Sequence, residues 1–153
     1  MASGSRATKP TTGASRIDRS FFDTNILIYA DDADAGPKRN LALDLLNNHI
    51  RAGTAVLSTQ ILQEYYSVAT RKLGISHEVA RRKVELLGRL DLVQVDLDLI
   101  LAAIDIQRLH SLSFWDALVV RSAVVSGCTV LLSEDLQDGR LIDGLRILNP
   151  FRV

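Results

Sequence analysis

The alternation of short apolar runs with helical patterns is the feature that most restricts how this chain can fold. The apolar runs cover residues 20–23, 54–58, 92–95, 129–133 and 145–148. Apolar side chains recur between them at the spacing of amphipathic helices, over residues 37–53, 59–73, 76–90, 97–110 and 113–127. Strands that alternate with helices pair in parallel, because each connection crosses over a face of the sheet. The pattern therefore predicts an α/β fold of three layers, with a mainly parallel central sheet of about five strands.

Length and composition are those of one soluble domain. The chain has 153 residues, of which 47% are hydrophobic and 24% charged. Its longest uninterrupted apolar run, residues 99–104, is far too short for a membrane span. Residues 1–18 are rich in Ser, Thr, Gly and Ala without apolar periodicity, so we expect a disordered tail there and the folded domain over 19–153. The single cysteine excludes an internal disulfide and indicates a reducing, cytoplasmic setting.

Four acidic residues stand where a parallel α/β sheet places its ligands. Asp23 ends the first predicted strand, and Asp135 follows the fourth. Glu64 lies at the edge of the apolar face of its predicted helix, and Asp116 lies on an apolar face near the start of another. Ligands of such sheets bind at the carboxyl ends of the strands. We therefore predict that these four carboxylates meet in one crevice.

Each acid taken alone also fits a structural role. Asp116, for example, has the spacing of a capping box with Ser113. Together the acids repel one another, since two carboxylates about 5 Å apart cost roughly 3 kcal/mol at an effective dielectric of about 20. Such a cluster either holds protons or binds a hard cation, and oxygen ligands select Mg²⁺ or Mn²⁺. Ions held in this way commonly serve phosphodiester hydrolysis.

The segments around the acids occur in a fixed order: FFDTNILIYA at 21–30, QEYYSV at 63–68, SFWDALVV at 113–120 and LLSEDLQDG at 131–139. They resemble the acidic motifs of PIN-domain ribonucleases, and most closely those of VapC toxins from bacterial toxin–antitoxin pairs. The resemblance implies a PIN-like fold and a divalent-metal-dependent endoribonuclease that acts as the toxin of such a pair. It also implies an RNA substrate, a cognate antitoxin and a homodimer. The implied catalytic and metal-binding residues, with Mg²⁺ or Mn²⁺ as cofactor, are Asp23, Glu64, Asp116 and Asp135, supported by Asn25 and Ser133.

A basic run follows the second motif. Its cations are Arg71, Lys72, Arg81, Arg82, Lys83 and Arg89, and the first five of them are the candidate RNA-backbone contacts. The run is either an ordinary solvated helix face or a track for an RNA backbone, and the helix that carries Glu64 leads toward it. Asp138 fits a longer form of the fourth motif and is either a further site acid or a loop residue.

Two other functions are compatible with parts of the pattern. An aspartate-nucleophile phosphatase needs a second Asp two positions after the first, but Asn25 stands there. A degenerate PIN domain that only binds nucleic acid or protein would fit the same fold, although the presence of all four acids argues against it. The sequence therefore favours the nuclease.

Residues 97–110 form an unusually apolar predicted helix. Only a narrow edge marked by Asp98 and Asp105 is acidic. A helix that is apolar around most of its circumference is buried on more than one side, and one sheet covers only one side. The pattern therefore predicts a further burial surface on this helix, and the resemblance to VapC toxins, which form homodimers through helices, implies that a second copy of the chain covers it.

Overall fold

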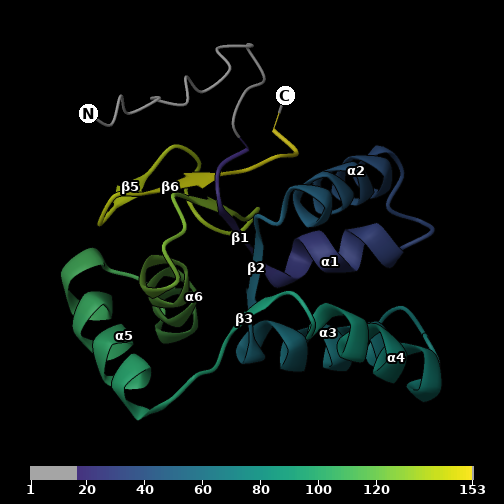
Figure 1. Cartoon of the computed structure of the whole chain (residues 1–153), viewed down its shortest axis with the longest axis horizontal. Coiled ribbons are helices and arrows are strands. Elements are labelled where there is room, and N and C mark those ends of the chain that lie inside the picture. Colours follow the sequence, from purple (N-terminus) through teal and green to yellow (C-terminus); the bar gives the residue numbers. More distant parts are fainter. Residues whose placement is uncertain (1–16, 153) are drawn as a thin grey trace, which may run out of the picture.

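The computed structural model describes residues 17–152, which form six helices and six strands (Figure 1). The strands are β1 (Ser20–Phe22), β2 (Ala55–Ser58), β3 (Asp91–Val93), β4 (Val130–Leu132), β5 (Leu141–Ile142) and β6 (Leu145–Leu148). The helices are α1 (Thr24–Asp31), α2 (Pro37–Ala52), α3 (Thr59–Arg71), α4 (His77–Leu87), α5 (Leu97–His110) and α6 (Phe114–Val125). None of these helices combines the length and apolarity needed to cross a membrane. The tail predicted over 1–18 lies outside the described residues except for Ile17 and Asp18.

All six strands form one sheet in the order β3-β2-β1-β4-β6-β5. Each neighbouring pair is parallel except β5 with β6. All five strands that the sequence pattern predicts are present, and β5 is added to them; it spans only two residues and carries no pattern of its own. A tight turn of Asp143 and Gly144, both at positive φ, joins β5 to β6. The strand order reverses between β1 and β4, which makes that boundary the switch point of the sheet.

Short polar side chains begin several helices and so determine where the site residues lie. The Ser58 hydroxyl accepts a hydrogen bond from a backbone N–H in the first turn of α3. The Ser113 hydroxyl accepts one from the backbone N–H of Asp116 at 3.1 Å, which starts α6. Asp23 begins α1, which runs for eight residues. The caps therefore place Asp23 and Asp116 at helix starts.

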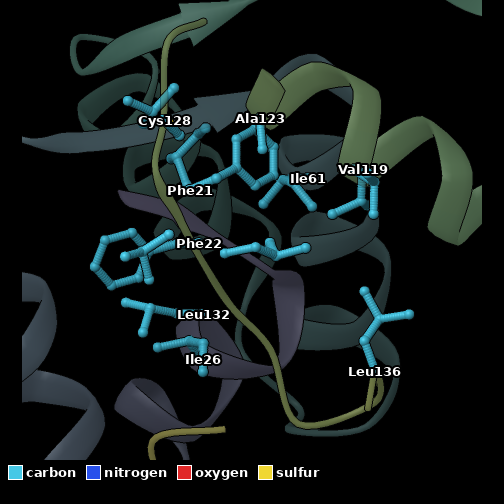
Figure 2. Packing of buried hydrophobic residues seen from close by; sticks show 14 of the residues in the cluster. Phe21, Phe22, Ile26, Ile61, Val119, Ala123, Cys128, Leu132 and Leu136 are labelled. Carbon is cyan, nitrogen blue, oxygen red and sulfur yellow. The ribbon is translucent and has the colours of Figure 1, made fainter. Parts of the chain in front are cut away.

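The apolar core lies between the sheet and the helices on its two faces. Helices α5 and α6 lie on one side of the sheet in Figure 1, and α1 and α2 lie on the other. Figure 2 shows side chains from β1, β4, α1, α3 and α6 gathering in this core. Phe21 and Phe22 are fully buried, and neighbouring residues of a strand point to opposite faces. Strand β1 therefore anchors both helical layers, and the predicted α/β sandwich is confirmed.

Helix α5 has the predicted bounds, but it is buried on one face only within a single chain. Leu99, Ala103 and Ile106 are buried against the rest of the fold. Leu97 and Leu101, which lie one turn apart, are 67% and 51% exposed. Part of the apolar surface that the sequence predicts for this helix is therefore exposed on the described chain.

Candidate active site

The switch point of the sheet gathers polar residues at one edge. Strands β2, β1 and β4 are parallel neighbours, so their carboxyl ends open on the same side. The residues at these ends are Ser58, Asp23 and Ser133, and all three are buried. The backbone N–H of Asp23 donates to the carbonyl of Leu132 at 3.0 Å, which continues the β1–β4 pairing to the edge. This is the position at which sheets of this type bind ligands.

Asp23 is the most buried of the four predicted site acids, with 7% of its surface exposed. One carboxylate oxygen accepts the Ser133 hydroxyl at 2.7 Å, and the other accepts the backbone N–H of Thr24 at 2.8 Å. Burial raises the pKa of Asp23 to about 6, against the effect of these two hydrogen bonds. The negative charges of Asp135 and Glu64 contribute to this rise in the same direction as burial. Ser133, which the family resemblance implies as a supporting residue, therefore contacts Asp23 directly.

Glu64 projects from α3 toward the same edge and has a hydrogen-bond donor on each carboxylate oxygen. The Thr24 hydroxyl donates to Oε2 at 2.5 Å, and the Gln60 amide donates to Oε1 at 3.0 Å. Thr24 therefore contacts two predicted site acids, Asp23 through its backbone and Glu64 through its side chain. The sequence singles out neither Thr24 nor Gln60, because both are residue types that are common on any helix.

Asp116 and Asp135 complete the acidic edge. Asp116 is half-buried in the first turn of α6, and Asp135 lies two residues after Ser133. The backbone N–H of Asp135 donates to the Ser133 hydroxyl at 3.2 Å, so the same serine contacts both strand-end acids. Desolvation raises the pKa of Asp135, and the next largest cause is the charge of Asp116. Asp135 therefore lies within electrostatic reach of the other three acids, and Asp23 lies within reach of Asp135 and Glu64.

A divalent cation fits the chemistry of this edge. A cleft of about 350 Å³ is lined by Thr24, Asn25, Glu64, Lys72 and Asp135, among others. Neither polar atom of the buried Asn25 amide has a hydrogen-bond partner among the described residues. The amide nevertheless lies close enough to Asp135 to offset part of the rise in the pKa of that carboxyl. Within residues 17–152, no group of three or more acidic, His or Cys side chains is arranged closely enough to hold a metal ion as the side chains stand. The donor set consists of oxygens that repel one another, which suits Mg²⁺ or Mn²⁺.

Comparison with known proteins identifies the family. The family model of the PIN domain matches residues 20–138, a range that contains all four acids. The chain belongs to the PIN domain family. No curated protein matches its sequence.

Two solved structures share the fold of this PIN domain. A toxin–antitoxin complex from Klebsiella pneumoniae matches with 19% identity and a TM-score of 0.66, over 88% of this chain and 99% of that chain. The toxin VapC20 from Mycobacterium tuberculosis, described as cleaving the sarcin–ricin loop, matches with 20% identity and a TM-score of 0.63. That match covers 76% of this chain and 91% of that chain. The cleft described above lies in the part of the chain that the family model covers.

The other acids of the fourth motif have different contacts in this PIN domain. The Asp138 carboxylate accepts the backbone N–H of Asn149 at 2.8 Å and lies 3.7 Å from the Arg152 guanidinium. Glu134 pairs with Lys38 at 2.8 Å, and this hydrogen bond lowers the pKa of Glu134. Of the two alternatives for Asp138, the loop residue is therefore the one that its contacts favour.

The five basic residues differ in how they are engaged. Lys72 lines the cleft and is exposed. Arg81 and Arg82 both pair with Glu85, at 2.6 and 2.9 Å. Lys83 pairs with Asp31 at 3.2 Å. The remaining cation, Arg71, is exposed on the last turn of α3.

Proposed function

We propose that this PIN domain is a divalent-metal-dependent endoribonuclease that acts in the cytoplasm as the toxin of a toxin–antitoxin pair. The observation that carries the proposal is the meeting of Asp23, Glu64, Asp116 and Asp135 at the switch point. The similarity to the Klebsiella complex and to VapC20 supports the toxin assignment. A desolvated carboxylate beside other acids, such as Asp23, is typical of a catalytic site.

In this proposal the four carboxylates hold one or two Mg²⁺ or Mn²⁺ ions. A bound ion would acidify water for in-line attack on phosphorus and stabilise the departing 3′ oxygen. Ser133 and Thr24 hold the two oxygens of Asp23 in fixed directions. Thr24 and Gln60 do the same for Glu64, and Asn25 adds an unpartnered amide at the cleft. The expected products carry a 5′-phosphate and a 3′-hydroxyl.

A metal-dependence assay on purified protein tests this function. Single-stranded RNA is incubated with the chain in Mg²⁺, in Mn²⁺ and in excess chelator, and the product ends are identified. We expect cleavage with either metal, none with chelator, and 5′-phosphate ends. Cleavage that persists in chelator, or products with cyclic phosphate ends, would refute the metal mechanism. RNA binding without cleavage under every condition would favour the degenerate binding module.

We further propose that the RNA backbone runs from the cleft along the basic residues of α3 and α4. These residues are Arg71, Lys72, Arg81, Arg82 and Lys83. Lys72 is the strongest candidate, because it shares the cleft with Glu64 and Asp135. Lys83 is the weakest, because its ammonium group is held by Asp31.

Replacing Lys72 with Ala is expected to weaken RNA binding for every sequence to a similar extent. Each phosphate contact releases counterions, so the slope of log Kd against log salt concentration should flatten by about 1. Binding is measured in chelator to prevent cleavage. Arg51→Ala, an exposed change on α2, is the control and should leave the slope unaltered. A Lys72→Ala slope equal to that of wild type would remove Lys72 from the RNA surface.

The proposed antitoxin is a separate chain that binds beside the acids. An apolar groove of about 420 Å³ lies between α3 and α4 and is lined by Leu62, Tyr66 and Val84, among others. It adjoins the helix that carries Glu64, so a segment bound there could extend a basic side chain toward the carboxylates. A cation from the antitoxin would compete with the metal for the same negative charge.

We also propose that two copies of the chain associate through α5. Several large apolar side chains of this helix are exposed to solvent in the single chain: Leu97, Leu101, Ile104 and Leu109. Trp115 at the start of α6 is 61% exposed, and α6 packs beside α5 in Figure 1. Exposed apolar residues on two helices that pack together are typical of protein interfaces.

Replacing Leu101 with Lys is expected to convert a dimer into a monomer, because the ammonium group would be buried without a partner in the interface. Light scattering at micromolar concentration should give twice the chain mass for wild type and one chain mass for the variant. The control is Val79→Lys, since Val79 is 62% exposed on α4, outside the proposed interface. A monomeric wild type, or a dimeric Leu101→Lys, would contradict the interface.

A further inference from the structure

Gln60 is a buried polar side chain that no sequence motif explains. It lies one turn before Glu64 on α3 and is only 4% exposed. Its amide nitrogen donates to Glu64 Oε1 at 3.0 Å and to the backbone carbonyl of Trp115 at 3.4 Å. Trp115 directly precedes Asp116. One amide group therefore contacts one predicted metal ligand and the backbone beside another.

The contacts of Gln60 leave Glu64 able to bind a cation. A carboxylate oxygen has two lone pairs. Gln60 occupies one on Oε1, and the Thr24 hydroxyl occupies one on Oε2. Each oxygen retains a lone pair, while the plane of the carboxylate is fixed from both sides. This is the arrangement expected of residues that orient a ligand without replacing it.

Gln60 is poorly suited to a purely structural role. Its amide orientation is determined by the two acceptors that it faces, because a flipped amide would place its oxygen against two other oxygens. In the observed orientation, Gln60 Oε1 is buried and has no hydrogen-bond partner among the described residues. A buried acceptor without a partner destabilises a fold. An apolar side chain of the same length would therefore suit the core at least as well.

We propose that Gln60 is a positioning residue of the metal site. It fixes the carboxylate of Glu64 and links α3 to the first turn of α6, so that Glu64 and Asp116 keep the spacing a shared cation needs. The proposal rests on the proposed function, since it takes Glu64 and Asp116 as metal ligands. It predicts that Gln60 governs metal affinity and does not contribute to the stability of the metal-free chain.

The test replaces Gln60 with Met, which keeps the length of the side chain and removes the amide. Calorimetric titration of the metal-free protein with Mn²⁺ should give a Kd about 10-fold or more above that of wild type. The Tm of the metal-free variant should equal or exceed that of wild type, because the unpartnered oxygen is gone. Gln63→Met is the matched control, since Gln63 is exposed on the same helix. It should change neither Kd nor Tm.

A wild-type Mn²⁺ affinity in Gln60→Met would overturn the proposal. So would a lower Tm with unchanged affinity, which is the result expected of a structural residue. Gln60→Leu is measured in parallel, and failure of both variants to fold would also assign Gln60 to the fold. If the wild-type chain binds no Mn²⁺, the metal site itself is refuted and the proposal for Gln60 with it.

Discussion

Amide replacement of any one of the four acids is expected to reduce RNA cleavage by more than about 100-fold. The variants are Asp23→Asn, Glu64→Gln, Asp116→Asn and Asp135→Asn. The amide side chain lacks the negative charge of the carboxylate. Its NH₂ group donates hydrogen bonds, whereas a metal ion needs the lone pairs of oxygen ligands. Residues that merely orient metal ligands already change affinity or activity by about 10–100-fold, so the loss of a ligand should exceed that range. Initial rates at saturating Mg²⁺ measure the effect, and circular dichroism verifies folding.

Glu78→Gln is the control for this series. Glu78 is exposed in the first turn of α4, outside the cleft. Its replacement should leave the cleavage rate within about twofold of wild type, because an exposed charge away from the site changes little. Any one of the four site variants that cleaves at the wild-type rate would remove its residue from the site.

Asp23→Asn is expected to raise the Tm of the metal-free protein at pH 7.5 by about 6–12 °C. The pKa of Asp23 rises from an ordinary value of 3.8 to about 6 in the folded chain. The folded protein therefore holds this proton between these pH values while the unfolded chain releases it, and stability falls as pH rises through that window. At neutral pH the buried carboxylate destabilises the fold by about 3 kcal/mol, since one pKa unit corresponds to about 1.4 kcal/mol.

The asparagine keeps the hydrogen bonds of Asp23. Its oxygen can accept the Thr24 N–H, and its nitrogen can donate to the Ser133 hydroxyl, which then accepts instead of donating. Thermal melts in chelator at pH 7.5 and pH 4 measure the gain, which should shrink at the lower pH. Asp44→Asn, an exposed change on α2, is the control and should have no such pH dependence. A lower Tm for Asp23→Asn at pH 7.5 would contradict the conclusion that the ionised carboxylate of Asp23 destabilises the fold.

The order and type of the elements could be predicted because local signals mark them. Pro37 begins α2 at its first position, and Gly53 ends it with a positive φ. The predicted bounds of α5 are those observed, since its apolar pattern is long. Strand β5 could not be predicted, because two residues have no periodicity and their pairing with β6 is a tertiary contact. The strand order of the sheet is also set by contacts between distant segments.

The candidate site could be predicted only in part. The acids and Ser133 follow strands or helix caps that the sequence indicates, and their positions at the switch point follow from the parallel sheet. Gln60 and Thr24 could not be predicted, because their importance lies in side-chain contacts with Glu64. The pairing of Lys83 with Asp31 joins residues far apart in the chain and weakens one predicted RNA contact.

Sequencing of 5′-phosphate RNA ends in cells that express the chain tests the central claim most directly. The wild-type protein is compared with Asp23→Ala, which lacks one predicted metal ligand. We expect new 5′-phosphate ends at discrete positions within a short time of induction of the wild-type protein, and none above background with Asp23→Ala. An identical set of new ends from both proteins, or none from the wild-type chain, would contradict a metal-dependent endoribonuclease.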